Sequence, residues 1–236
     1  GIVLLPSLSK AIKRDNKNEI HNTQNRSLEF SLLISLPSAV GLYVLSNPII
    51  HILFERGAFV AEDTLYTAQV LSIFSLGLPA YILIKVLITC FFAREDTKTP
   101  LYISIVSVVI NIALSLVLIS TMREMGIALA TSISAWANVL LLFFTLRIKK
   151  NLNLDKKFIR NSLKVIISSA ILLIVCFFMN QIFFINIHNS SFIIKIWTLS
   201  LVIFSCIIIY LSMIFILKVL TISDLKGYIR KTYGKK

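Results

Sequence analysis

Long apolar stretches alternate with short polar segments along the whole chain. Six stretches are long enough to cross a lipid bilayer, which takes about 20 predominantly apolar residues in a helix. Hydrocarbon offers a backbone no hydrogen-bond partners outside its own segment, so each stretch is expected to be helical. The pattern predicts an all-α integral membrane protein whose transmembrane helices cover about residues 28–50, 65–92, 101–121, 126–146, 163–184 and 193–217.

The composition agrees with this class and argues against catalysis. Of the 236 residues, 57% are hydrophobic and 15% charged, with a mean hydropathy of +0.86, whereas soluble domains are nearer half apolar and a quarter charged. Cys90, Cys176 and Cys206 lie in separate apolar stretches, without the spacing of a metal site or a redox pair. Phosphate-binding, serine-hydrolase and zinc-protease motifs are absent from the sequence. We therefore expect no enzymatic activity, no cofactor and no metal centre.

The basic residues predict an orientation in the membrane. The formal net charge is +13, but the cations form clusters between apolar stretches, a pattern typical of membrane proteins and not of nucleic-acid binding. Of 24 lysines and arginines, 20 lie in the N-terminal segment, the connections at 93–100 and 147–164, and the C-terminal tail, against 3 in the intervening connections. Because cytoplasmic connections carry the excess of Lys and Arg, both ends of the chain are expected in the cytoplasm.

Two of the predicted helices contain prolines. Pro37 interrupts the first, and Gly77 with Pro79 interrupts the second. A proline removes an internal hydrogen bond and bends a helix. Two interpretations stay open: these positions are hinges of a protein that moves, or they are prolines that a membrane helix tolerates through packing.

Polar residues within the third and fourth predicted helices fall on single faces. Their spacing of three or four residues is that of one side of a helix. One interpretation is interhelical packing with hydrogen bonds across the contact, and the other is the lining of a polar cavity or cation site. The two sets are Ser104, Ser107, Asn111 and Ser115, and Thr131, Ser134 and Asn138.

The connection at 93–100 has four charged residues of both signs within five positions. They are Arg94, Glu95, Asp96 and Lys98. Asp96 or Thr99 could cap the next helix, with Pro100 at its first position. A capped turn does not explain the charge density, which a charge network formed in only one conformation of the protein would explain. We therefore treat these residues as a candidate cytoplasmic gate.

Lys85 is a cation deep inside the second predicted helix. A charged residue within a membrane span is costly and is usually functional. Snorkelling of the long side chain to the cytoplasmic interface is one explanation. The other, which we favour, is that Lys85 faces a cavity and meets an anion.

Five motifs together resemble one family. They are "LLPSLS" at 4–9, "LPSAVGL" at 36–42, "FERGAF" at 54–59, "LIKVL" at 83–87 and "FFAREDTKTP" at 91–100. Their order and spacing are similar to those of the MurJ (MviN) family, bacterial lipid II flippases of the MOP exporter superfamily. The resemblance is strong from Gly1 to about Arg147 and continues to the C-terminus by hydropathy and helix count. A looser form of the "REDTKTP" loop occurs in related multidrug exporters, and "FERGAF" favours the MurJ family.

The resemblance implies an architecture of about fourteen helices in two lobes plus a final pair. This chain would be the C-terminal half, with the end of a preceding helix and a basic loop in 1–26, four helices in 27–147, a basic loop in 148–162 and the final pair with a basic tail in 163–236. The remaining N-terminal half of the same transporter is then a partner, and the family's cavity arginines lie in it.

The resemblance also implies a function and sites. The expected function is to move undecaprenyl-pyrophosphate-linked disaccharide-peptide across the bacterial inner membrane by alternating access. The expected site residues are Lys85 in the cavity, the gate residues above, and Glu55 and Arg56 in an outer loop. A sodium site of the family is similar to Asn111, Ser115 and Thr131, but Ser115 stands where a carboxylate is expected. Coupling to the membrane potential or to a monovalent cation is therefore an expectation.

Two alternatives stay open. One is another transporter of the superfamily, for polysaccharide-linked lipids or drugs. The other is a membrane enzyme acting on polyprenyl lipids, which would need carboxylates or histidines clustered at a membrane face.

Overall fold

The computed structural model describes residues 4–184 and 191–219. That part of the chain contains helices and no strand. The basic tail expected beyond 218 lies outside the described residues apart from Lys218 and Val219, as do residues 185–190 of the last interhelical connection. The helices are α1 (Leu4–Lys13), α2 (Lys17–Val44), α3 (Ser46–Phe54), α4 (Ala61–Phe92), α5 (Lys98–Ile148), α6 (Lys156–Phe184) and α7 (Phe192–Ile216).

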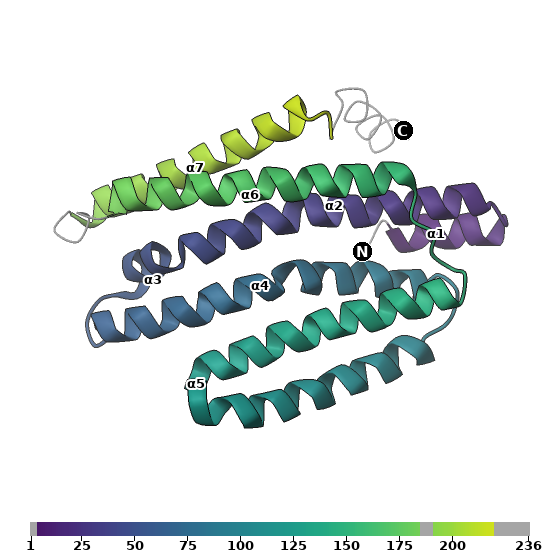
Figure 1. Ribbon diagram of the computed structural model, residues 1–236, viewed down its shortest axis with the longest axis horizontal. Helices are drawn as coiled ribbons and strands as arrows, with labels where there is room; N and C mark the ends of the chain where they lie inside the picture. The colour runs from purple at the N-terminus through teal and green to yellow at the C-terminus, as the bar shows by residue number, and fades with distance from the viewer. Residues whose placement is uncertain (1–3, 185–190, 220–236) are drawn as a thin grey trace.

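The long helices lie side by side along a common direction (Figure 1). α2 is in the middle of the bundle: α6 and then α7 follow on one side, and α4 and then α5 on the other. The turn at 93–97 and the linker at 149–155 share one end of the bundle, which we call the linker end. The loop after α3 and the tip of α5 share the opposite end, which we call the far end.

The six predicted membrane crossings correspond to five helices that are long and apolar enough to cross a membrane, because two of the predicted crossings lie in the two halves of α5. α5 has 51 residues and folds back at Arg123, whose φ of 48° and ψ of −130° are not helical. Its arms, 98–122 and 124–148, form the hairpin seen in Figure 1. Gly126 lies just after the fold, where a Cβ atom would come within 2.5 Å of the Leu118 carbonyl oxygen. A glycine is therefore required for the arms to meet.

Three helix boundaries differ from the prediction. The first predicted span begins earlier, because the Asn16 side chain accepts a hydrogen bond from the Glu19 N–H and caps α2 there. Most of the expected basic loop before residue 27 is therefore helical. The same span also ends earlier, since α2 stops at Val44 and α3 begins after a break at Leu45. The linker expected over 148–162 is shorter as well, because α6 begins at Lys156.

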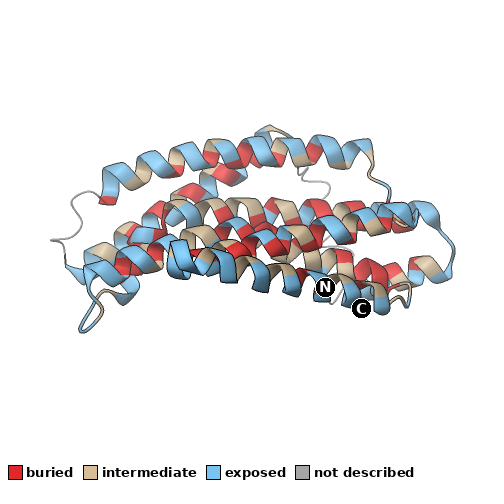
Figure 2. Ribbon diagram, turned by 60° about the horizontal axis from the view of Figure 1, so that its bottom comes forward, coloured by how far each residue is buried: buried red, intermediate tan, exposed pale blue. Residues whose placement is uncertain are grey.

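Two clusters of buried apolar side chains hold the bundle together, one on each side of α2. The first joins α1 and α2 to α4 and the second arm of α5, with Leu87, Phe91 and Leu142 almost fully buried. The second joins α2 and α3 to α6 and α7 through side chains such as Val165 and Val202. Figure 2 shows this buried interior and the exposed outer faces of the helices.

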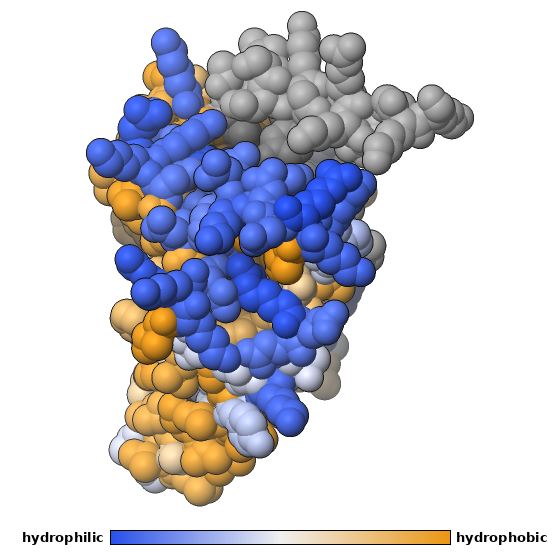
Figure 3. Space-filling model, turned by 90° about the vertical axis from the view of Figure 1, so that its right-hand side faces the viewer, coloured by the Kyte–Doolittle hydropathy of each residue, from blue (hydrophilic) through white to orange (hydrophobic). Residues whose placement is uncertain are grey.

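The exterior is that of a membrane protein. Apolar residues are exposed along the long helices, most of all on the first arm of α5, where Leu116 is 70% exposed. Hydrophilic side chains instead cover the linker end, and apolar ones flank it (Figure 3). Such a surface suits helices in hydrocarbon with one end in water.

Candidate functional site

The charged turn between α4 and α5 is hydrogen-bonded to Lys149, the residue that follows the second arm of α5. The carboxylate of Asp96 accepts hydrogen bonds from Thr99, at 3.1 Å from the backbone N–H and 2.8 Å from the hydroxyl. Asp96, which lies just before the N-cap residue Thr97, therefore caps the first turn of α5, one of the two alternatives that the sequence left open. Lys149 Nζ donates to Asp96 Oδ2 at 2.7 Å, and this bond holds the pKa of Asp96 at about 2. α5 begins at Lys98, so Pro100 lies in its first turn and not at its first position.

In this conformation the other charges of the turn are not joined in a network within the described part of the chain, so the predicted network of one transport state stays a prediction. Arg94 donates to two backbone carbonyls, Cys90 O at 2.9 Å and Asn151 O at 3.0 Å. Among the described residues, neither Glu95 nor Lys98 takes part in an ion pair. The partner of Asp96 is thus Lys149, and Arg94 anchors the linker.

Helix α2 holds the same linker from its other side. Gln24 Nε2 donates to Asn151 O at 3.2 Å, and Asn25 Nδ2 donates to Asn153 O at 2.9 Å. Asn151 O therefore accepts from both Gln24 and Arg94. Both α2 amides are almost completely buried. The linker is consequently a docked segment, held by α2 and by the end of α4.

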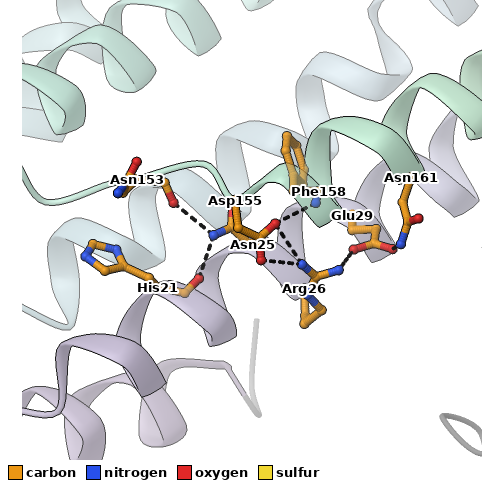
Figure 4. Close-up of polar contacts among 8 residues, drawn as sticks. All are labelled: His21, Asn25, Arg26, Glu29, Asn153, Asp155, Phe158 and Asn161. Carbon is orange, nitrogen blue, oxygen red and sulfur yellow. Dashed lines mark hydrogen bonds and ion pairs between the residues drawn. The ribbon is translucent and has the colours of Figure 1, made fainter.

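An ion-pair chain continues from the linker into α6 (Figure 4). Arg26 Nη2 donates to both carboxylate oxygens of Asp155, at 2.6 and 2.9 Å, and Arg26 also pairs with Glu29. Burial alone would raise the pKa of Asp155, but the bonds from the Phe158 N–H and from Arg26 hold that pKa below its ordinary value. Asn161 of α6 donates to Glu29. We call these contacts the linker clamp, and they fix the start of α6 against α2.

The polar faces of the two α5 arms meet inside the hairpin. Asn111 Nδ2 donates to Thr131 Oγ1 at 3.3 Å and to Ser134 Oγ at 3.2 Å, and Ser115 Oγ donates to Asn111 Oδ1 at 3.1 Å. The three residues of the sodium prediction are thus brought together. These hydrogen bonds also satisfy the packing interpretation, and every member of the cluster is neutral. The cation site stays a prediction.

The other predicted cavity residues lie apart from that cluster. Asn138 is buried on the second arm, one turn beyond Ser134, and its side chain is not among the partners of Asn111. Lys85 is exposed on α4, and none of the ion pairs among the described residues includes it. Its exposure agrees with both interpretations, a position facing a cavity and a side chain that snorkels to the cytoplasmic interface. Its anionic partner stays a prediction.

At the far end, the outer-loop residues join α3 and α4 to α7. Glu55 accepts from Thr64 Oγ1 at 2.7 Å and lies 2.8 Å from His51 Nδ1. Lys195 Nζ lies 3.1 Å from His51 Nε2. An ammonium can only donate, so His51 accepts at Nε2 and carries its proton at Nδ1, toward Glu55. Arg56 lies over the Phe192 ring, 5.8 Å from its centroid.

Both proline-containing helices continue through their prolines. Pro37 lies inside α2 and Pro79 inside α4. The backbone breaks of the described chain are at Leu45 and Arg123 instead. The hinge interpretation of Pro37, Gly77 and Pro79 stays a prediction.

Comparison with known proteins identifies the family. The family model described as "Lipid II flippase MurJ" matches residues 1–198. This chain belongs to the MurJ family. A probable lipid II flippase MurJ of Rhizobium tropici is 45% identical over 172 residues, which are 73% of this chain and 32% of that protein. One from Rickettsia prowazekii (strain Madrid E) is 34% identical over 217 residues, which are 92% of this chain and 43% of that protein.

A solved MurJ structure has the same fold. "Lipid II flippase MurJ, inward closed conformation" matches with a TM-score of 0.67 and 33% sequence identity, over 87% of this chain and 42% of that one. The family assignment from the five motifs is thus confirmed. The chain spans less than half the length of the MurJ relatives described here.

Several residues of the linker clamp and the far end were not predicted from the sequence as site residues. Weak signals exist for some of them: Arg26 and Glu29 are three positions apart, and His51 and Glu55 are four apart, spacings that place side chains together on a helix. For Lys149 and Lys195 the partners are distant in sequence, and only the fold brings them together.

Proposed function

We propose that this chain is part of a lipid II flippase, which moves the undecaprenyl-pyrophosphate-linked disaccharide-peptide from the inner to the outer leaflet. Membership of the MurJ family over residues 1–198 carries this proposal. The architecture supports it, because apolar helices with internal polar clusters suit alternating access around a polar path. No bond is made or broken in this process. Among the described residues, no group of three or more His, Cys, Asp or Glu could hold a metal ion.

The proposed setting is the bacterial inner membrane, with both ends of this chain in the cytoplasm. The clustering of lysines and arginines at the linker end supports this orientation. The rest of the same transporter is the proposed partner, together with membrane lipids. Lys85, exposed on α4, would then meet an anion from the substrate or from that remaining part. The Asn111 cluster is the candidate for coupling to a monovalent cation, and the membrane potential is the alternative driving force.

The decisive experiment is transport by the complete protein of which this chain is a part. Purified protein is reconstituted in vesicles with lipid II, and exposure of the substrate on the opposite leaflet is followed with an impermeant enzyme. We expect exposure well above that in empty vesicles, and background exposure with this chain alone. Transport of a polysaccharide-linked lipid or a drug in place of lipid II would favour the alternative transporters. Repeating the assay with and without a sodium gradient tests the cation coupling.

A further inference from the structure

Helix α4 passes through Pro79 beside the second arm of α5. Proline has no N–H, and its ring excludes the carbonyl four residues earlier, that of Ser75. The helix therefore lacks one hydrogen bond here, and further donors can brace the backbone around this gap. In membrane helices, side chains of the same or a neighbouring helix can supply them.

The structure provides such donors in the turn before Pro79. Ser132 Oγ donates to Ile73 O at 3.0 Å, and Trp136 Nε1 donates to Leu76 O at 3.0 Å. Ser132 and Trp136 are four residues apart, so both project from one face of α5. Within α4, Ser75 Oγ donates to Ser72 O at 2.6 Å. The carbonyls of Ser72, Ile73 and Leu76, close to the interrupted position, thus accept from side chains, and no side-chain donor to Ser75 O is found among the described residues.

Gly77 explains how α5 comes close enough. A Cβ atom at Gly77 would lie 2.9 Å from Ser132 Oγ and 2.9 Å from the Tyr81 hydroxyl. Real side chains essentially never make such contacts, so any other residue here would displace Ser132 or Tyr81. Ser132 is 3% exposed, and its hydroxyl is thus shielded from water. The glycine, the proline and the two α5 donors form one local arrangement.

This arrangement has consequences for the part of α4 beyond Pro79. That part carries Lys85 and leads into the turn at 93–97, with Arg94 and Asp96. Its direction depends on the backbone around Pro79, because a proline interrupts the ladder that would otherwise stiffen the helix. Two hydrogen bonds from α5 fix that backbone.

We propose that Ser132 and Trp136 are positioning residues, which hold the α4 backbone before Pro79 against α5 and thereby place Lys85 and the 93–97 turn during transport. This inference rests on the proposed function. Neither side chain needs to contact the substrate, since each acts through the α4 backbone. The pair also gives the Gly77 and Pro79 hinge prediction a physical form: the direction of α4 beyond Pro79 changes when the two hydrogen bonds from α5 break.

The test uses the complete transporter with spin labels on α4 at Leu65 and Phe92, one on each side of Pro79 and both exposed. Trp136→Phe keeps an aromatic ring but removes the indole donor. Trp197→Phe is the matched control, because Trp197 is 72% exposed on α7. Pro79→Ala restores the missing N–H and serves as the reference for a helix with an uninterrupted hydrogen-bond ladder.

We expect Trp136→Phe to shift or broaden the label-to-label distance distribution and to slow lipid II flipping roughly three- to tenfold at equal protein amounts. Trp197→Phe should change neither. Ser132→Ala removes a hydroxyl and creates no clash, and it should shift the distances in the same direction. This second variant still tests the inference if Trp136→Phe does not fold. Unchanged distances in both variants would overturn the inference. A wild-type protein that does not flip lipid II would instead refute the proposed function, while the distance measurement would still decide the role of the two donors.

Discussion

Lys149 Nζ lies 2.7 Å from Asp96 Oδ2, although the two residues are 53 positions apart in the chain. Lys149 follows the last residue of α5, and Asp96 stands just before its first turn. The ion pair therefore closes the base of the α5 hairpin. Lys149 also donates to Thr99 Oγ1 at 3.0 Å and lies 5.9 Å from the centroid of the Phe91 ring. The charged turn at 93–97 thus has a structural role in this conformation.

A double-mutant cycle with Asp96→Asn and Lys149→Met should show this coupling. The two side chains are 26% and 42% exposed, so each substitution is expected to lower the free energy of unfolding by about 0.5–1 kcal/mol. The double variant should lose little more than either single variant, because both remove the same contact. Unfolding of the purified protein in detergent gives these values. The control is Arg94→Gln combined with Asp96→Asn, for which the changes in the free energy of unfolding should be additive. Strong coupling between these two substitutions would instead support a network that contains Arg94 and Asp96.

The same ion pair makes a prediction about pH. The pKa of Asp96 is lowered from 3.8 to about 2, first of all by the hydrogen bond from Lys149. Because the folded-state pKa is the lower one, the contribution of Asp96 to stability is fully present above about pH 4 and is lost as the pH falls through about 2. Titration of the labelled Asp96 carboxyl by NMR should give a midpoint near 2 in the intact protein. Lys149→Met should move that midpoint back toward 3.8, and a midpoint near 4 in both proteins would refute the pair.

The linker clamp should protect the linker from proteases. Arg26→Gln removes the two bonds to Asp155 and leaves Glu29 without its cation. Loss of hydrogen bonds to charged groups costs about 1–3 kcal/mol, so local opening and trypsin cleavage after Lys150 should rise roughly tenfold or more. Arg14→Gln, at an exposed arginine just after α1, is the control. Equal cleavage rates in both variants would show that the clamp does not hold the linker.

The crossings were predictable from sequence because their signal is local. An apolar run of about 20 residues is sufficient to indicate a transmembrane helix, and the excess of charge at 147–164 marks a connection. The cap by Asp96 was also predictable, because an aspartate three positions before a backbone N–H at a helix start commonly accepts its hydrogen bond. The fold at Arg123 agrees with the boundary expected between residues 121 and 126.

The rest of the candidate site depends on contacts between distant parts of the chain. Lys149 and Asp96 are one example, and Arg26 with Asp155, 129 positions apart, is another. Neither pair has a periodicity that could reveal it. The α2 boundary was wrong for a different reason: the polar residues from 17 to 27 suggested a loop, but a capped helix continues through them beyond the apolar run.

The orientation predicts which positions an impermeant thiol reagent reaches from outside. In a protein whose three cysteines are replaced, Ala61→Cys at the far end should react, and Asn16→Cys and Asn153→Cys at the linker end should not. All three positions are exposed on their helices or loops, so burial does not protect them. Labelling of intact cells gives the answer, with permeabilised cells to show that every cysteine can react. The opposite pattern would reverse the orientation.

The two glycines at Gly126 and Gly41 should respond to alanine in opposite directions. A Cβ at Gly126 would come within 2.5 Å of the Leu118 carbonyl oxygen and 2.7 Å of its carbonyl carbon. Backbone atoms cannot rotate away as a side chain can, so Gly126→Ala should destabilise the protein by about 1–3 kcal/mol through forced separation of the α5 arms.

At Gly41, inside α2, a Cβ would meet no atom within 4 Å among the described residues. Gly41→Ala should therefore stabilise the protein by about 0.5–1 kcal/mol, since alanine loses less backbone entropy than glycine in a helix. The midpoints of thermal unfolding in one detergent, compared with the unchanged protein, test both substitutions. If Gly126→Ala left the midpoint unchanged or raised it, the close approach of the two arms after Arg123 would be wrong. The Gly41 variant shows in the same experiment that a change of this size can be detected.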